Sequence, residues 1–365
     1  MSSSADPGDD PRATARRIGA AVAVVALIVV LTTISVVALG PSARGLASPS
    51  PSSDTGLASP SASSSPSPLP SVVGIPGSPA PSGPSPSPAP VVVRVDSIAG
   101  LLRALADDRN DEIVVADGTY HVSPSSDVAA DSLWIDGRFA RRTNPVLVRA
   151  ETSGGVTFDG GGGDGYSALS FEDGAHDQTW DGFTFANMRA NRSGIVEIAG
   201  YTPKRAPHDI TLRNITIERS CTGRARSASA PALDHAFYIA NALDPGPHDL
   251  LFENITVDGR GGLASAFQFF HSANGAPNAS NVVVNGLRAT GMQQGLILWD
   301  PTLHDITFED VVINAAITYG VRYETVGSTD ILLSNVTTRR SGFAGFQSSQ
   351  GSHPHGVTFQ DVSLR

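Results

Sequence analysis

Short runs of alternating apolar and polar residues recur along most of the chain at a nearly constant step. Each repeat holds an apolar-x-apolar triplet after a small residue, then a turn, then two more triplets separated by Asn, Asp or Gly. The separating residues are Gly182, Asn214, Asn254, Gly286, Asp310, Asn335 and Asp361. A period of 24 to 40 residues predicts a solenoid with three short strands per coil, in which each coil buries its apolar face against its neighbours.

An amphipathic segment, DSIAGLLRALADD, precedes the repeats and predicts a helix. Its apolar residues fall on one helical face, and a polar residue before them can cap the first turn. These apolar residues are Ile98, Leu101, Leu102 and Leu105, with Asp96 or Ser97 as the cap. The following run, EIVVADGTYHV, predicts a strand and a turn.

Three strands per coil, with Asn or Gly at a tight bend that tolerates positive φ, resemble the right-handed parallel β-helix of the pectate-lyase-like superfamily. The resemblance covers residues 91–365. It implies an all-β domain whose N-terminal helix covers the open end of the apolar core. It also implies a substrate cleft along the first strand of each coil and its flanking loops.

The first 90 residues have a different character. Residues 1–17 are polar and predict a cytoplasmic tail, and residues 18–39 are an uninterrupted apolar run without a charge. The run is long enough to cross a bilayer as a helix, and the arginines before it place the N-terminus in the cytoplasm. A cleaved signal peptide is the alternative, although its apolar region would be unusually long. Under both interpretations, the rest of the chain lies outside the cytoplasm.

Residues 41–90 consist almost entirely of Ser, Pro, Ala and Gly. Such a segment cannot bury a core and predicts a disordered linker that could extend to roughly 150 Å as polyproline II. We therefore expect a single-pass protein of the cell membrane, with the β-helix domain outside the cytoplasm.

The net charge and the cysteine content argue against some classes of binding partner and against disulfide cross-links. The chain carries a formal net charge of −10, which disfavours duplex nucleic acid and anionic membrane surfaces. Its single cysteine, Cys221, excludes an intramolecular disulfide. The oligomeric state stays open.

Period-2 alternation predicts which side chains of each first strand face outward. One predicted outward column comprises Glu197, Tyr238, Gln268, Ile297, Arg322 and Gln347. Two residues further along, Phe270 and Trp299 lie on adjacent coils, and sugar rings pack on such exposed aromatic surfaces. A covering loop is the alternative. At the strand ends, His271 and Asp300 share a column and complete the predicted substrate-binding set.

A polysaccharide lyase needs a base for the C5 proton, an acid for the leaving oxygen and a cation for the uronate carboxylate. The run DHAFYI resembles the H-G-I-Y motif common in uncharacterised bacterial β-helix proteins, with Ala236 in place of Gly. His235 could be the base and Tyr238 the acid, while Arg224 and Arg226 could neutralise the carboxylate. A structural role for His235 in a turn is the alternative.

A glycoside hydrolase would instead need two carboxylates across a sugar, and Glu197 with Asp234 is the best pair available. Arg322 lies three coils from Tyr238, about 14 Å at the strand spacing, and would serve a different subsite. A calcium site would need several carboxylates together. Glu197, Asp234 and Asp300 are too dispersed to form one, so no cofactor is expected.

Five histidines recur at one repeat position, four of them followed by Asp: His176, His208, His248, His304 and His355. We expect them to close the turn before the second strand and to stack from coil to coil, with a metal ladder as the alternative.

The leading functional hypothesis is action on a cell-surface or environmental polysaccharide by lyase-type elimination. A non-catalytic glycan-binding or surface-display module and a glycoside hydrolase are the alternatives.

Overall fold

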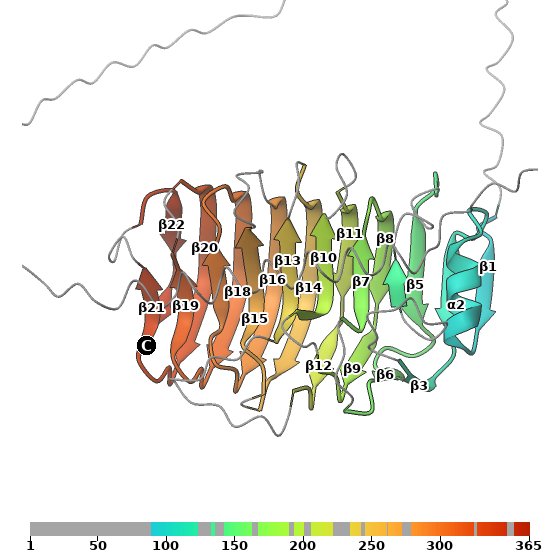
Figure 1. Cartoon of the computed structure of the whole chain (residues 1–365), viewed down its shortest axis with the longest axis horizontal. Coiled ribbons are helices and arrows are strands. Elements are labelled where there is room, and N and C mark those ends of the chain that lie inside the picture. Colours follow the sequence, from blue (N-terminus) through green and yellow to red (C-terminus); the bar gives the residue numbers. More distant parts are fainter. Residues whose placement is uncertain are drawn as a thin grey trace, which may run out of the picture. The chain divides into compact units, whose positions relative to one another are not determined.

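The computed structural model describes residues 89–122, 133–135, 142–162, 167–189, 193–200, 206–221, 234–241, 245–260, 262–271, 279–324, 327–348 and 354–365. Within these residues the chain forms one short helix and two sheets of parallel strands (Figure 1). No helix in these ranges is long and apolar enough to cross a membrane. The membrane helix predicted at 18–39 and the linker predicted at 41–90 lie outside them.

The larger sheet, sheet A, has 15 strands. They are β1 (Val92–Val95), β2 (Glu112–Val115), β3 (Gly118–His121), β5 (Val146–Ala150), β6 (Val156–Asp159), β8 (His176–Asp181), β9 (Phe183–Ala186), β11 (His208–Arg213), β12 (Thr216–Glu218), β14 (His248–Asp258), β16 (Ser280–Thr290), β18 (His304–Asn314), β20 (Thr329–Arg339), β22 (Val357–Gln360) and β23 (Ser363–Leu364).

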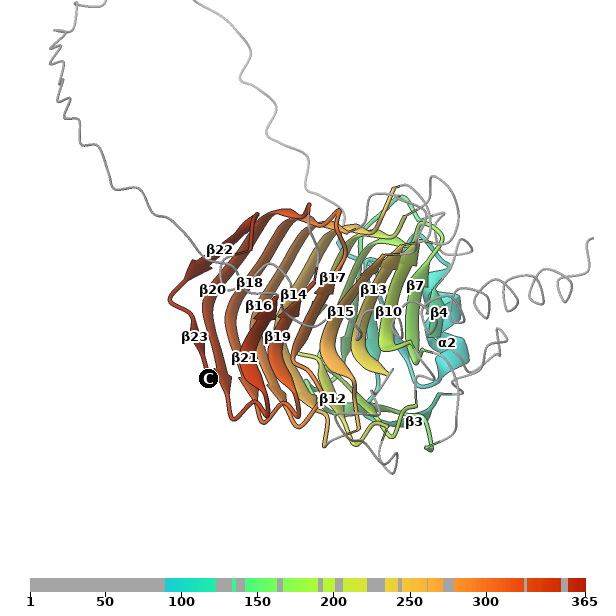
Figure 2. The same ribbon diagram turned by 60° about the vertical axis from the view of Figure 1, so that its left-hand side comes forward.

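The smaller sheet, sheet B, has eight strands. They are β4 (Leu133–Ile135), β7 (Leu169–Glu172), β10 (Gly194–Gly200), β13 (His235–Asn241), β15 (Ser265–His271), β17 (Leu296–Trp299), β19 (Tyr319–Tyr323) and β21 (Ala344–Ser348). Each strand pairs in parallel with the strand of the next coil, as in β13 with β10 and β15 (Figure 2). The predicted parallel β-helix is confirmed, with the side chains between the sheets forming a continuous apolar core.

Tight bends occur at the predicted repeat positions. All seven residues have positive φ: Gly182 (84°), Asn214 (55°), Asn254 (51°), Gly286 (78°), Asp310 (53°), Asn335 (50°) and Asp361 (52°). The amide of Asn254 donates to the side-chain oxygen of Asn214 at 2.6 Å, and Asn214 donates to Asp181 at 2.7 Å. The bend residues therefore supply the left-handed conformation and also connect successive coils by hydrogen bonds.

The first three of the five repeated histidines stack as expected, whereas Ser280 lies between His248 and His304 in the strand register. The rings of His176 and His208 lie 5.0 Å apart at 4°, and those of His208 and His248 lie 5.0 Å apart at 2°. The Nδ1 atom of His248 lies 2.7 Å from Oδ2 of Asp249, which has a φ of 55°. In the part of the chain described here, no three His, Cys, Asp or Glu side chains gather around a common metal position. The ring stacking and the His248–Asp249 contact support the turn-closing interpretation.

The predicted helix, α2 (Ile98–Leu105), packs at the N-terminal end of the core. Ser97 caps it by accepting a hydrogen bond from the backbone N–H of Gly100. Buried Arg142 donates to the carbonyl oxygens of Leu105, Asp107 and Asn110, which satisfies the end of the helix and the turn after it.

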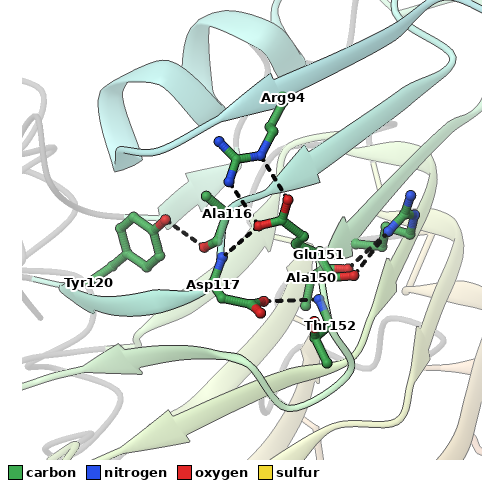
Figure 3. Close-up of polar contacts among 8 residues, drawn as sticks. Arg94, Ala116, Asp117, Tyr120, Ala150, Glu151 and Thr152 are labelled. Carbon is green, nitrogen blue, oxygen red and sulfur yellow. Dashed lines mark hydrogen bonds and ion pairs between the residues drawn. The ribbon is translucent and has the colours of Figure 1, made fainter.

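Polar contacts tie this first part of the domain to the coil beyond it (Figure 3). Arg94 on β1 binds Glu151 through two hydrogen bonds of 2.9 and 2.8 Å. The backbone N–H of Asp117 also donates to Glu151, and that of Thr152 donates to the Asp117 carboxylate. Glu151 therefore joins segments from three separate coils.

Candidate functional site

The strand register aligns the six residues of the predicted outward column of sheet B. Successive partners across β10, β13, β15, β17, β19 and β21 are Glu197, Tyr238, Gln268, Ile297, Arg322 and Gln347. The alternating residues predicted to face inward are buried: Phe237, Ile239, Phe267, Phe269, Leu296, Leu298, Val321 and Tyr323. The six residues therefore form one column of side chains that runs from coil to coil along sheet B.

Buried polar side chains are frequent on sheet B and in the residues next to its strands. On sheet B and the residues next to its strands, the described ones include Ser167, Ser170, Glu172, Ser193, Glu197, Asp234, His235, Ser265, Gln268, Gln293 and Gln294. Buried polar groups are costly unless they are paired. A strip of them outside an apolar core is typical of a site that holds a polar ligand away from water.

Glu197 is held by two serines. The hydroxyls of Ser167 and Ser193 both donate to its Oε2, at 2.5 and 2.7 Å, and the carboxylate is 5% exposed. The two serines precede strands of neighbouring coils, β7 and β10. These hydrogen bonds stabilise a carboxylate that would otherwise be costly to bury.

Tyr238 is the register partner of Glu197 on the next coil. Burial of the phenol raises its pKa above the ordinary value of 10.0, and the neighbouring Glu197 carboxylate raises the pKa further. In the described part of the chain, the phenol has no hydrogen-bond partner. The hydroxyl therefore keeps its proton and can donate it to a bound molecule.

His235 faces the same way as Tyr238 because the strand bends at its start. The next residue, Ala236, enters the apolar core together with Phe237, although alternation would place only one of them there. The His235 ring consequently stacks on Tyr238, with centroids 5.5 Å and planes 18° apart. Its Nδ1 lies 2.8 Å from the hydroxyl of Ser265, which fixes the ring orientation.

An aromatic row continues from this pair along the stacking axis. Tyr238 and Phe270 lie 5.9 Å apart at 25°. Phe270 and Trp299 lie on adjacent coils as predicted, 6.4 Å apart at 86°, so the two rings meet edge to face. The guanidinium of Arg322 lies over the Trp299 ring, 5.7 Å from its centroid. Aromatic and cationic side chains thus adjoin on four consecutive coils.

Arg322 on β19 is held by Glu324, the first residue after that strand. Its Nε and Nη2 atoms lie 2.7 and 2.6 Å from a single oxygen, Oε1, of Glu324. The two side chains are 27% and 19% exposed. Arg322 is three register steps from Tyr238, which agrees with the separate subsite expected from the sequence.

Two acidic residues of the predicted site are wholly buried. Asp234 precedes β13 and is 0% exposed. Asp300 is also 0% exposed, and its Oδ1 accepts hydrogen bonds from the backbone N–H and hydroxyl of Thr302 at 2.7 and 2.8 Å. These bonds give Asp300 a turn-closing role at the end of β17.

For three of the predicted substrate-binding residues, the structure describes no side chain. Arg224 and Arg226 lie in the range 222–233, and for His271 the structure describes the backbone but no side chain. The backbone of His271 ends β15 in register with Asn241.

Sequence reasoning missed the serines that hold the site. Ser167, Ser193 and Ser265 lie just before or at the start of sheet B strands, and each binds a site residue on its own or a neighbouring coil. A serine two or three positions before the apolar triplet recurs in these coils, and that signal could have found them.

No known protein-family profile matches the chain, and no curated protein matches it. Among solved structures, the surface protein and adhesin PfbA of Streptococcus pneumoniae is similar at 12% identity, with a TM-score of 0.42 over 66% of this chain and 62% of that one. The PL6 family alginate lyase AlyGC is similar at 12% identity, with a TM-score of 0.40 over 76% of this chain and 40% of that one. The A-module of the mannuronan C-5 epimerase AlgE4 of Azotobacter vinelandii gives 13% identity and a TM-score of 0.27, over 69% of this chain and 86% of that one. Overlaps of this size carry no conclusion about activity.

Proposed function

We propose that this protein binds a polysaccharide on the outer face of sheet B and cleaves it by β-elimination at His235 and Tyr238. The observation that carries the proposal is the stacked contact of an imidazole and a protonated phenol beside a buried carboxylate. The two rings supply a proton acceptor and a proton donor within one site.

The proposed step keeps its atoms and electrons in balance. The imidazole of His235 takes the proton from C5 of a uronate, and the electron pair forms the C4–C5 double bond. The C4–O bond breaks, and the phenol of Tyr238 gives its proton to the leaving oxygen. A phenol is protonated at neutral pH, so Tyr238 carries the proton that this donor role requires.

Elimination also needs a cation beside the uronate carboxylate, which acidifies the C5 proton. Arg322 is the one described basic residue on sheet B other than the histidines, and it is three coils from Tyr238. We assign the neutralising role to Arg224 and Arg226, as the sequence suggests.

Hydrolysis by Glu197 and Asp234 suits the geometry less well. Glu197 already accepts two serine hydroxyls, and Asp234 has no exposed surface. A glycan-binding module without catalysis is favoured by a different observation, the aromatic row that ends at Trp299 and Arg322. Such rows hold sugars without any need for chemistry.

A turnover screen of the full-length protein on a polysaccharide panel tests the proposal. We expect unsaturated-uronate absorbance together with new reducing ends on at least one polyuronate-containing polymer. New ends without absorbance would overturn elimination and favour the carboxylate pair. Binding without either signal would overturn catalysis and favour the glycan-binding module.

The predicted topology is part of the proposal. A membrane helix at 18–39 and a linker at 41–90 would hold the β-helix outside the cytoplasm, where polysaccharide is found. Protease added to intact cells should then remove the β-helix domain while sparing the N-terminal tail.

A further inference from the structure

Trp299 adjoins the Arg322–Glu324 pair, and within the described residues three polar atoms of this group have no protein partner. In the described part of the chain, no residue accepts from the Trp299 indole N–H. The same holds for Nη1 of Arg322, and no residue donates to Oε2 of Glu324. An aromatic ring beside a guanidinium and a carboxylate that keep further donors and an acceptor suits the binding of a sugar unit.

The guanidinium of Arg322 is held along one side only. A guanidinium has five N–H donors in a fixed fork, and here the Nε and Nη2 side is occupied by one oxygen of Glu324. The end formed by Nη1 and Nη2 keeps further N–H donors. The guanidinium also lies over the Trp299 ring, with its carbon 5.7 Å from the ring centroid, so the ring and Glu324 together restrict its position.

Glu324 determines which ligand chemistry fits beside this fork. Both of its contacts with Arg322 go to Oε1, so Oε2 offers an acceptor close to the open guanidinium donors. A donor next to an acceptor matches two neighbouring hydroxyls, one accepting from Arg322 and one donating to Glu324. A carboxylate could use the fork but would be repelled by Oε2, since two anions would adjoin.

We infer that Trp299, Arg322 and Glu324 form a subsite for an uncharged sugar unit that presents a vicinal diol. The inference rests on the proposed glycan-binding function and adds the sugar class of a second position. Trp299 lies two coils and Arg322 three coils from Tyr238, so the subsite is about 10 to 14 Å along the axis from the reacting sugar. The ligand is therefore a polymer in which an uncharged unit lies several sugars away from the cleaved bond.

The test compares binding of a native polyuronate with that of its carboxyl-reduced form, which has the same backbone without the charges. Binding of both is measured by calorimetry on the full-length protein and on the variants Trp299→Ala, Arg322→Ala and Glu324→Gln. Arg339→Ala, which removes an exposed arginine from sheet A, is the matched control. Thermal melting confirms that each variant is folded.

We expect Trp299→Ala and Arg322→Ala to weaken binding of the reduced polymer roughly tenfold or more, with Arg339→Ala unchanged. Glu324→Gln keeps the shape but removes the repelling charge, so it should raise binding of the native polyuronate relative to the reduced form by about tenfold. Folded Trp299 and Arg322 variants that bind both polymers like the wild type would overturn the subsite. An unchanged ratio in Glu324→Gln would overturn the uncharged-sugar assignment. Failure of the wild type to bind any glycan would overturn the proposed function together with this inference.

Discussion

His235 and Tyr238 lie ring against ring, 5.5 Å and 18° apart, although their positions in β13 have opposite parity. The bend at Ala236 makes this possible, because it turns His235 out of the core and onto the outer face. The Ser265 hydroxyl then holds the imidazole in place. The contact joins a base and an acid that a straight strand would place on opposite faces.

The first prediction concerns this pair. His235→Ala should lower turnover by about 10² to 10⁴, because it removes the proton acceptor, and Tyr238→Phe should do the same by removing the donor. Affinity for the polymer should change little in either variant, since binding depends on the aromatic row. Unsaturated-uronate absorbance and calorimetry on the same preparations measure the two quantities. His208→Ala removes an imidazole from sheet A and should keep turnover; parallel losses of affinity and turnover at His235 would argue for a structural role.

A second prediction follows from the raised pKa of Tyr238. Its folded pKa lies above the unfolded value of 10.0, so the folded state holds this proton more tightly. The contribution to stability is fully present below pH 10 and is lost as the pH rises through the folded pKa. The free energy of unfolding should therefore fall above about pH 10, and less steeply in Tyr238→Phe. Thermal melts between pH 9 and 11 measure the effect, with Tyr319→Phe as the matched loss of a hydroxyl from sheet B. Identical pH profiles for wild type and Tyr238→Phe would mean that the phenol is not buried.

The repeat pattern made much of this structure predictable, because the period determines which residues become neighbours on adjacent coils. The bends at Asn214 and Asn254 and the contact of Glu197 with Tyr238 follow from that alignment alone. The bend before Phe237 does not, because alternation assumes a straight strand. Nor does the pattern show that Ser167 reaches Glu197 across 30 residues of sequence.

A third prediction tests the bend residues. Asn254 has a φ of 51° and donates to Asn214. Asn254→Ala should cost about 1 to 2 kcal/mol of unfolding free energy, because alanine lacks the short polar side chain that lets asparagine adopt the left-handed conformation. Asn254→Gly should cost less, since it loses only the exposed hydrogen bond. Urea unfolding measures both, and Glu253→Ala, one residue earlier in β14, is the control. Equal costs for Ala and Gly would show that the hydrogen bond, not the backbone, dominates.

A fourth prediction separates binding from chemistry. Phe270 lies between Tyr238 and Trp299 and contacts both rings. Phe270→Ala should weaken polymer binding about tenfold while leaving the turnover of bound substrate within a factor of a few, because no proton passes through it. The ratio of KM to kcat effects reports the difference. Phe343→Ala removes an aromatic side chain that is 63% exposed and lies outside the row, so it should leave both constants unchanged. A loss confined to kcat would place Phe270 at the reacting sugar.

The last prediction concerns Gly194, a position next to Tyr238 where a side chain does not fit. Gly194 begins β10 and pairs with His235. A β-carbon there would collide with the carbonyl oxygen of Val196 and would lie 2.7 Å from Cβ and 2.8 Å from the backbone nitrogen of Tyr238. These are backbone and near-backbone atoms, so Tyr238 itself must move. Gly194→Ala should therefore cost about 1 to 3 kcal/mol of unfolding free energy.

Turnover should fall further than this destabilisation alone explains, because the phenol shifts relative to His235. Gly259→Ala is the comparison, since its nearest contacts are with Met292 at 3.1 Å and it lies away from the outer face of sheet B. Turnover is normalised to the folded fraction, measured by near-ultraviolet circular dichroism. A Gly194→Ala variant that folds and turns over like the wild type would mean that the position of Tyr238 does not matter. The elimination chemistry would then have to be assigned to other residues.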